Sequence, residues 1–429
     1  MAVGHSVDAA VWRRVLQDAL ARVGRWFARS ETRGTVSQFV AGLLGPVERK
    51  NGWWLAEHAG HVSPDRMQRL LRTAVWDERG VQADLARFVV DQLGAGDAVL
   101  VIDETGYLKK GVCSVGVQRQ YSGTAGRVEN SQIGVFLGYA CAAGRALLDV
   151  RLYLPRSWVA DPGRCAAAGI PADIEFATKP QLAWQMIAAA LRAGITAAMV
   201  TGDEAYGLEP LLRAGLRELG LGYVLAIARN QHIQATTTIR LRADDLAVNL
   251  DELAWERRSA GAGSKGERFY DWAWIHDHTT GDDAGVHSLL VRRSISTGEL
   301  AFYRCWTPHP VPLSRLITVA GRRWAIEEAF QQAKTHVGLD HYQCRGWRAW
   351  HRITILAMLA LAILVATAAA HRDRHPTDNT LVPLSIGELR RLTANPSPTA
   401  IRWSTWRRHH QATARHSHHR RRSDPATST

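Results

Sequence analysis

The sequence predicts an α/β protein whose core is preceded by an all-helical region and interrupted by an all-β segment. Three observations lead to this prediction. Residues 1–94 have helical periodicity, residues 95–228 alternate apolar strand-like runs with helices, and residues 229–310 contain short strands without helices. Helical patterns return at residues 311–395, where we expect the second part of the core. A chain of 429 residues is long enough for two or three domains of ~150 residues each.

The composition is that of a packed globular protein with an excess of positive charge. Hydrophobic residues make up 46% and charged residues 22%, which argues against disordered, collagen-like and disulfide-scaffold proteins. The 53 Lys and Arg residues outnumber the 40 Asp and Glu residues and give a net charge of +13. Residues 401–429 alone carry seven Arg and one Asp. This excess predicts a polyanionic partner, nucleic acid before an acidic membrane surface.

Cysteine spacing and the first residues predict a cytoplasmic protein. The five cysteines are odd in number and never closer than 24 residues, which excludes a zinc knuckle or CxxC motif and indicates reduced thiols. Residues 1–20 lack the long apolar stretch of a signal peptide. Residues 353–370 carry no charge and just reach the length of a membrane span, but seven are Ala and two are Thr. We therefore expect a buried core helix there and no membrane association.

Residues 1–94 are expected to form a helical DNA-binding domain. Ser63-Pro64 supplies an N-cap followed by proline at the first helical position, and an apolar helix face follows. Basic residues lie off such faces, and we select Arg49 and Lys50 among them as phosphate contacts. The alternative, that these cations only solvate helix surfaces, is equally supported because no clear helix-turn-helix signature is present.

Two apolar strands each end in an Asp-Glu pair. Residues 98–102 form a continuous apolar run, typical of a strand buried on both faces, and Asp103 follows it. Residues 197–200 form a second apolar strand that leads to Asp203. α/β folds place active sites at the carboxyl ends of parallel strands, and side-chain alternation allows only one acid of each pair to line a shared site. For either pair alone, a turn or a helix cap is the commoner explanation.

A third acid, Glu327, lies on a helix predicted for residues 322–337. At about 100° per residue, Glu327 falls at the edge of the buried face of this helix. The same stripe holds Arg323 and Lys334, whereas Glu328 faces nearly opposite the core. Taken alone, a surface Arg–Glu pair at i,i+4 spacing, worth only ~0.3–0.5 kcal/mol, is the commoner explanation.

The ordered set of acids resembles the DDE transposases of bacterial insertion sequences. The resemblance is closest to the branch with a Tyr-x2-Arg-x3-Glu-x6-Lys signature, which Arg323, Glu327 and Lys334 match. Ala320 stands at the position of the signature tyrosine, so no role of that tyrosine is carried over. Further segments that resemble this group are residues 119–126, 129–130, 152–155, 158, 338–342, 345 and 347. The likeness extends over roughly residues 45–395.

The resemblance implies a ribonuclease-H-like catalytic core and a metal-dependent transposase. Asp103, Asp203 and Glu327 would be the catalytic acids and would hold two Mg²⁺ ions, for which Mn²⁺ can substitute. Arg323 and Lys334 would contact the phosphates beside the metals. The implied reaction is cleavage at the ends of an insertion sequence, followed by joining of the 3′-hydroxyl ends to target DNA.

The implied partner is double-stranded DNA, as terminal inverted repeats and as target. We expect at least a dimer on this DNA, in the bacterial cytoplasm and associated with the nucleoid. Arg119 and Arg345, which lie in the matching segments, are expected to contact the DNA. Two alternatives stay open: a transposase-derived regulator that binds DNA without cutting it, and a structure-selective nuclease on the same core.

Two further groups of residues are expected to contact DNA. Trp272 and Trp274 fall in the β segment, and in related hairpin-forming transposases insertion-domain aromatics stack on flipped bases, at ~1–3 kcal/mol per base. The alternative is that these tryptophans form the core of a small β domain. Residues 396–429 are rich in His and Arg and predict a basic disordered tail, in which Arg407 and Arg408 add salt-sensitive affinity for DNA.

Overall fold

The chain folds around one large mixed sheet. The computed structural model describes residues 9–94, 96–263, 266–279, 285–374, 382–394 and 398–423. The strands are β1 (Val99–Leu108), β2 (Gln118–Ser122), β3 (Arg127–Cys141), β4 (Gly144–Leu152), β5 (Met199–Gly202), β6 (Gly222–Ile227), β9 (Glu256–Gly263), β10 (Gly266–His276), β11 (Val286–Arg293) and β12 (Leu300–Thr307). Within the described residues they form a ten-stranded sheet in the order β2-β3-β1-β5-β6-β12-β11-β10-β9, with β4 paired to β3.

The central strands combine antiparallel and parallel pairing. β3 is antiparallel to β1 and to β4, whereas β5 is parallel to both β1 and β6. The apolar run at the start of β1 and all four residues of β5 are buried, as expected for strands covered on both faces. The mixed α/β fold class that the sequence predicts is therefore confirmed.

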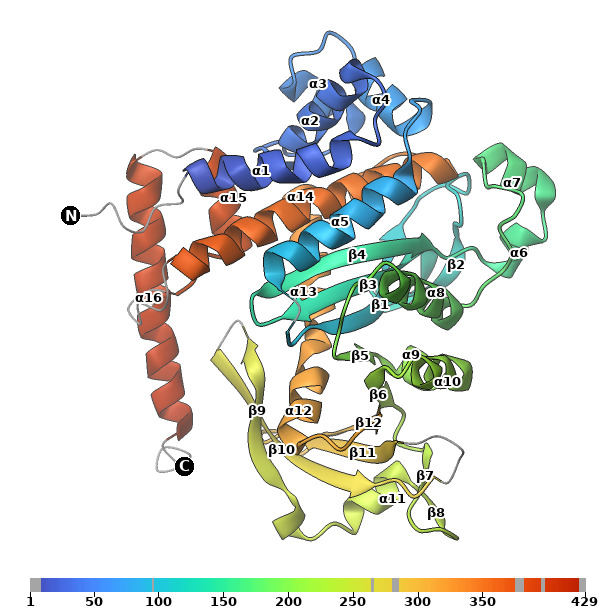
Figure 1. Cartoon of the computed structure of the whole chain (residues 1–429), viewed down its shortest axis with the longest axis vertical. Coiled ribbons are helices and arrows are strands. Elements are labelled where there is room, and N and C mark those ends of the chain that lie inside the picture. The colour runs from blue at the N-terminus through green and yellow to red at the C-terminus, as the bar shows by residue number, and fades with distance from the viewer. Residues whose placement is uncertain are drawn as a thin grey trace.

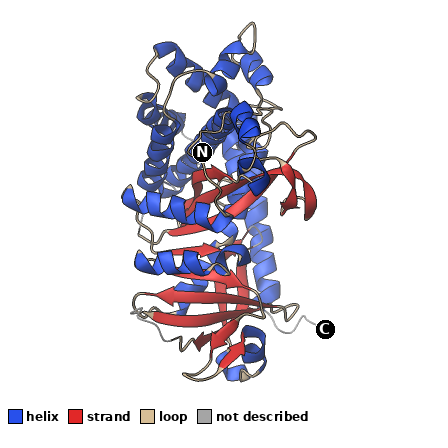
Figure 2. Cartoon of the chain, turned by 90° about the vertical axis from the view of Figure 1, so that its right-hand side faces the viewer, coloured by secondary structure: helices blue, strands red, loops and turns tan. Residues whose placement is uncertain are grey.

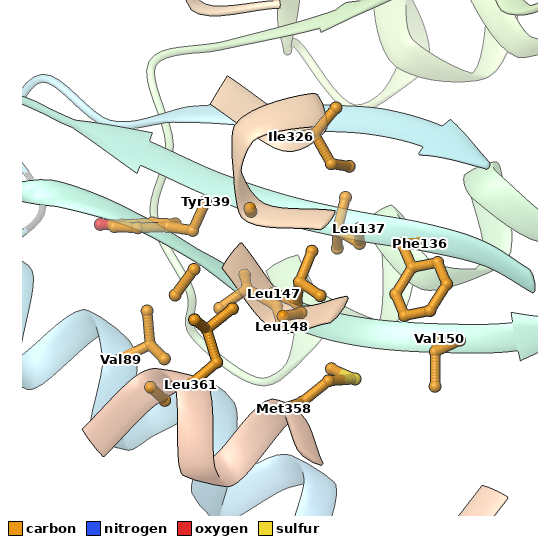
Figure 3. Packing of buried hydrophobic residues seen from close by; sticks show 14 of the residues in the cluster. Val89, Phe136, Leu137, Tyr139, Leu147, Leu148, Val150, Ile326, Met358 and Leu361 are labelled. Atoms are coloured by element: carbon orange, nitrogen blue, oxygen red, sulfur yellow. The ribbon is translucent and has the colours of Figure 1, made fainter. Parts of the chain in front are cut away.

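Helices cover this sheet and connect its strands. Along the core they are α6 (Arg156–Val159), α7 (Pro162–Ala168), α8 (Lys179–Arg192), α9 (Glu204–Gly207), α10 (Pro210–Glu218), α12 (Leu313–Arg322), α13 (Trp324–Gln332), the π-helical turn η2 (Ala333–Val337) and α14 (Trp347–Arg374). Figure 3 shows side chains of three helices gathered around the β3–β4 hairpin: Ile326 of α13, Met358 and Leu361 of α14, and Val89 of α5 (Glu78–Leu93). All four are buried in the same core.

The N-terminal helices pack directly on the core. They are α1 (Ala9–Gly24), α2 (Ser30–Leu44), α3 (Gly52–His58) and α4 (Asp65–Arg72), followed by α5. The helices α1, α2, α4 and α5 contact α14, and Figure 1 shows them along its length. Arg352 of α14 is buried and donates to the Glu78 carboxylate at 2.6 Å and to the carbonyls of Leu70 and Ala74 at 3.1 and 2.7 Å. This ion pair and these hydrogen bonds fasten the helical region to the core.

The helix α14 is the central core helix that residues 353–370 predict. It is long and apolar enough to cross a membrane by length and composition, and it is the one such helix among the described residues. However, 94% of its most apolar 18-residue window is buried inside the protein. Its apolar character therefore serves packing against α5, β4 and the N-terminal helices.

Residues 229–310 extend the core sheet. Their strand β12 pairs antiparallel with β6, and β11, β10 and β9 follow outward, so this region shares one sheet with the core. Figure 2 shows this strand-rich end opposite the helix-rich N-terminal end. The expectation that the region lacks helices is wrong, since α11 (Ala243–Val248) and a 3₁₀ turn (Glu252–Ala254) lie within it. Two short strands, β7 (His232–Gln234) and β8 (Arg240–Arg242), form a separate pair. Ala243 and Ala247 of α11 are buried in a small second core.

The expectation of a disordered C-terminal tail is wrong for residues 398–423. These residues form the helix α16 (Pro398–Ser423), which Figure 1 shows in red beside α15 (Ile386–Ala394) and reaching toward β9 and β10. Ser404 and Ala412 are buried on its packed face. The high content of charged residues predicted disorder. In the folded chain, however, contacts of Arg407 with Glu388 and of Arg408 with the Val382 carbonyl hold the helix in place.

Candidate active site

The parallel pairing of β1 with β5 brings Asp103 and Asp203 side by side. Ile102 is paired with Gly202 in the β1–β5 register, and Asp103 and Asp203 are the residues that directly follow this pair. Adjacent strands lie about 4.8 Å apart, which puts these two backbone positions at neighbouring points of the sheet, where β5 ends. Both aspartate side chains are partly buried. The prediction that both acids stand at strand ends is correct for Asp203 but wrong for Asp103, because residues 103–108 continue β1 by pairing with β3.

Asp203 also caps the helix that follows it. Its carboxylate accepts a hydrogen bond from the Ala205 amide at 3.0 Å, as an N-cap residue of α9 does. At the other end of α9, a β-carbon on Gly207 would lie 1.8 Å from the Ala226 carbonyl oxygen, so only glycine allows α9 to pack this closely on β6. Asp203 can therefore both cap α9 and belong to the site, because the hydrogen bond to the Ala205 amide orients its carboxyl group at the end of β5.

Core packing sets the position of Glu327. Its neighbour Ile326 is buried against Gly138 of β3, and the ring of Phe330 lies 5.1 Å from that of Phe136. Glu327 itself is partly exposed, with 39% of its side chain accessible. Glu328 instead forms an ion pair with Arg145. The predicted helix faces agree with this arrangement.

The Arg323 guanidinium pairs with Glu327. Its Nη1 donates to Glu327 Oε1 at 3.1 Å. Its positive charge also lowers the pKa of Asp103 and of Asp203, although less than the backbone hydrogen bonds that those carboxyl groups accept. Arg323 is mostly buried and its guanidinium stacks 4.7 Å from the Trp324 ring. The site therefore contains three carboxylates and one cation that interacts with all of them.

The carboxyl groups of the site have raised pKa values. Burial, and then the charge of Asp203, raises the pKa of Asp103 to about 8. Burial, and then the charge of Glu104, raises the pKa of Asp203. Burial also raises the pKa of Glu327, although Arg323 opposes this shift. Burial thus disfavours ionisation of these carboxyl groups, and a bound cation would favour their ionised forms.

Lys334 lies on the same side of β1 as Asp103. Its Nζ donates to Thr105 Oγ1 at 2.7 Å, and Thr105 lies two residues beyond Asp103, on the same face of the strand. Thr124 supports this contact, since its hydroxyl lies 3.3 Å from that of Thr105 and 3.4 Å from Nζ. Burial lowers the pKa of Lys334. The π-helical turn η2 carries this lysine, and such turns are frequent at functional sites.

Sequence reasoning missed a second polar group on the other face of β1. Glu104 accepts a hydrogen bond from the Tyr206 hydroxyl at 2.6 Å and forms an ion pair with Lys179. Glu104 raises the pKa of Asp203, so this group borders the site. Tyr206 follows Asp203 by three residues, which is the only sequence signal for its position. Nothing in the sequence links Lys179, at the start of α8, to this site.

The three acids do not converge on a single point. Among the described residues, no three side chains of His, Cys, Asp or Glu are arranged so that they could hold one metal ion. Glu327 is instead held by Arg323. The chemistry of the donors fits magnesium or manganese, because carboxylate oxygens are the ligands these hard ions prefer. In this arrangement of the described residues the predicted convergence of the three acids on one metal ion is therefore not seen.

The predicted DNA-contacting residues divide by exposure. Arg49, Arg119, Arg345 and Trp274 are exposed, and their roles stay predictions. Three of the others are buried, which corrects their assignment as surface contacts: Lys50, Trp272 and Arg408 are 2%, 1% and 7% exposed. Lys50 donates to the Gly42 and Gly45 carbonyls, Trp272 to the Arg258 carbonyl and Arg408 to the Val382 carbonyl, while Arg407 pairs with Glu388.

Comparison with known proteins gives two family matches. Residues 22–241 match the family described as DDE superfamily endonuclease, and residues 177–363 match the family described as transposase DDE domain. A curated relative, the "Probable transposase for insertion sequence element IS701" of Microchaete diplosiphon, is 27% identical over 195 residues. That alignment covers 45% of this chain and 48% of the relative, so the chain spans about half the length of the curated relative it matches.

A solved structure aligns with most of the chain. It is the cryo-EM structure of the piggyBac transposase synaptic complex with hairpin DNA. The alignment has a TM-score of 0.45 and 11% sequence identity, and it covers 93% of this chain and 82% of the other.

Proposed function

This chain belongs to the DDE superfamily endonucleases, and from that premise we propose that it is the transposase of an insertion sequence. It binds the terminal inverted repeats of the element as double-stranded DNA, cleaves at the element ends and joins the freed 3′-hydroxyl groups to target DNA. The observation that carries the proposal is the β1–β5 register. That register sets Asp103 beside Asp203, and Arg323 links both electrostatically to Glu327.

Asp103, Asp203 and Glu327 would hold two Mg²⁺ ions, or Mn²⁺ in their place. The raised pKa values of all three acids are compatible with this assignment, since burial disfavours their ionised forms and a bound cation would favour them. When bound, the metals supply activation of the attacking water or hydroxyl and charge neutralisation at the leaving oxygen.

The two cations of the site would position the DNA. Arg323 exchanges its bond to Glu327 for a bond to a phosphate oxygen next to the cleaved bond, which frees Glu327 to bind metal. Lys334 is fixed beside Asp103 by Thr105 and holds the next phosphate on that side. A guanidinium and an ammonium group on either side of the aspartates would thus orient the phosphodiester for in-line attack.

The strand arrangement supports a ribonuclease-H-like core for this enzyme. The antiparallel strands β4, β3 and β1 are followed in the sheet by the parallel strands β5 and β6, with Asp103 midway along β1 and Asp203 directly after β5. Because two element ends must be held together before they are joined, the active form would be at least a dimer on DNA. Its place of action would be the bacterial nucleoid.

One incubation separates this function from its alternatives. The full chain is mixed with Mg²⁺, the DNA that flanks its coding sequence and a target plasmid. Joined product supports a transposase, cut product alone a structure-selective nuclease, and a shifted but uncut complex a DNA-binding regulator. The same incubation without metal should give binding only.

Substitutions of the three acids test their assignment as catalytic residues. Asp103→Asn, Asp203→Asn and Glu327→Gln should each abolish cleavage while binding of the DNA persists. Glu328→Gln is the matched control, because Glu328 is the next residue on the same helix and pairs with Arg145 outside the site. Cleavage that survives Asp103→Asn in Mg²⁺, or that is lost in Glu328→Gln, would contradict the assignment.

A further inference from the structure

A second cationic feature lies at the far end of β1. A cleft of about 760 Å³, here called the basic groove, is lined by residues of three separate segments. Its cations are Arg49, Lys109, Lys110 and Arg345, and its acids are Glu48 and Asp340. Two of these cations, Arg49 and Arg345, come from the set selected on the sequence. The fold brings them together although almost 300 residues separate them.

A continuous line of side chains connects the active site to the basic groove. Lys334 binds Thr105, and its Nζ lies 5.8 Å from the centre of the Tyr107 ring. The Tyr107 ring lies 5.3 Å from the ring of Tyr342, and Lys109 Nζ lies 3.8 Å from the centre of the Tyr342 ring. Asp103, Thr105, Tyr107 and Lys109 alternate along the chain, so they follow one face of β1 and its extension.

The length of this line corresponds to a short stretch of DNA. Six residues at ~3.3 Å each give ~20 Å between Asp103 and Lys109. Base pairs of a duplex are spaced ~3.4 Å apart along the axis, so the groove lies ~6 base pairs from the acid site. A duplex that runs along β1 with its scissile phosphate at the aspartates would therefore reach the groove within the same turn.

The cations of the groove are available for such a ligand. Arg49, Lys110 and Arg345 are exposed, and within the described ranges no carboxylate forms an ion pair with any of them. Lys109 is partly buried, and burial lowers its pKa to about 8. A neighbouring phosphate would raise that pKa again and favour the charged form of the amine. The four cations outnumber the two acids of the groove, so the net charge favours an anion.

We propose that the basic groove binds the phosphate backbone of the DNA about six base pairs from the cleaved bond. Lys109, Lys110, Arg49 and Arg345 contact the phosphates, and the Tyr107–Tyr342 pair forms the floor between the groove and the active site. The groove thereby sets the distance between the contacted DNA and the aspartates. This inference rests on the proposed function, and its test uses binding without cleavage.

The first measurement is the salt dependence of DNA binding. Full-length protein carrying Asp103→Asn binds a fluorescent 30-base-pair duplex in EDTA, between 0.05 and 0.3 M KCl. Each lost phosphate contact lowers the slope of log K against log salt by ~0.9, so Lys110→Gln with Arg345→Gln should lower it by ~1.8. At 0.1 M KCl this corresponds to a ~60-fold weaker complex. Both side chains are exposed, so the double variant should keep its fold.

The matched control removes two exposed arginines far from the groove. Arg229→Gln with Arg240→Gln deletes the same charge from the strand-rich end of the molecule. In this control variant the slope of log K against log salt should change by less than half as much as in the groove variant. Equal losses in the two double variants would show a general effect of net charge and would overturn the proposal, as would an unchanged slope in the groove variant.

The second measurement uses a natural thiol of the groove. Cys113 is exposed and lines the cleft. A duplex that carries a phosphate-tethered mixed disulfide should cross-link to it: the Cys113 thiolate attacks the tether sulfur, a new disulfide forms and the small thiolate leaves. Cys113→Ser should abolish the cross-link. A bound duplex that forms no cross-link, or one that still forms it in Cys113→Ser, would place the DNA elsewhere.

The two hypotheses can fail separately. Groove variants that weaken binding, in a protein that never cuts DNA in Mg²⁺, would support the groove and overturn the transposase function. A protein that cuts and joins DNA, with groove variants that bind like the parent, would support the transposase function and overturn the groove.

Discussion

Replacement of Ile326 by alanine tests whether core packing positions the third acid. Ile326 is 2% exposed and directly precedes Glu327 on α13. Its side chain rests on Gly138, where a β-carbon would come within 3.2 Å of its Cδ1 atom. Figure 3 shows it above the β3–β4 hairpin, near Leu137. Truncation removes one of the contacts that fix the rotation of α13 about its own axis, and with it the direction of Glu327; the packing of Phe330 on Phe136 is another.

A second truncation in the core, Leu361→Ala, serves as a control that should cost the same free energy of unfolding as Ile326→Ala. Truncation of a fully buried isoleucine or leucine to alanine lowers the free energy of unfolding by ~2–5 kcal/mol. Leu361 of α14 is 0% exposed, loses the same number of carbon atoms on truncation and packs against the same hairpin without adjoining the site. Ile326→Ala and Leu361→Ala should therefore lose similar stability in urea unfolding.

Their effects on cleavage should differ. A displacement of about 1 Å in a catalytic group can cost ~100-fold in rate, so Ile326→Ala should cut DNA ~100-fold more slowly under single-turnover conditions. Leu361→Ala should cut at the parent rate at a temperature where circular dichroism shows both variants folded. Equal cleavage rates in the two folded variants would refute the claim that this contact positions Glu327.

Three further predictions concern stability and the C-terminal helix. Arg352→Leu should lower the free energy of unfolding by ~3–5 kcal/mol, because Glu78 and two backbone carbonyls lose a buried partner, and an unchanged urea midpoint would contradict this. Burial lowers the pKa of His351 to about 4, whereas the unfolded chain binds this proton near 6.5, so stability should fall from pH 6.5 toward 4. His351→Phe should flatten that fall, and an identical pH profile would refute it. Glu388→Gln should speed tryptic cleavage within α16, since Glu388 holds Arg407, and an unchanged rate would show that other contacts suffice.

Local patterns were enough to predict that Asp103 lies beside Asp203. Each aspartate follows a short buried apolar run, and such runs pair as neighbouring parallel strands, although the strand of Asp103 continues to Leu108. The face of Glu327 followed from helical geometry, which depends only on spacing along the chain. The fold class was predictable for the same reason, because alternating strands and helices bury their apolar faces in few ways.

Burial of individual cations and tryptophans was not predictable, because it depends on partners far away in the sequence. The sequence predicts Lys50 to be a surface lysine, yet its ammonium group donates to two carbonyls at the C-terminal end of α2. Trp272 and Trp274 are two residues apart on β10 and point to the same face, so only what packs over each position decides that Trp272 is in the core while Trp274 is 46% exposed. Arg408 belongs to a segment whose composition predicts disorder, and its contact with the Val382 carbonyl becomes visible only in the folded chain.

The alternation of β1 explains why one strand can serve both the cutting of DNA and the spacing of its contacts. Odd positions from Asp103 to Lys109 face Lys334 and the basic groove, while Glu104 faces Tyr206 and Lys179 on the other side. A shift of the β1 register by one residue would exchange these faces and move Asp103 away from Asp203 at the same time. The buried pairing of Val99 through Ile102 with β5 opposes that shift, since all four apolar side chains would have to repack on the opposite face of the sheet. The most apolar part of the strand therefore fixes the geometry of its most polar part.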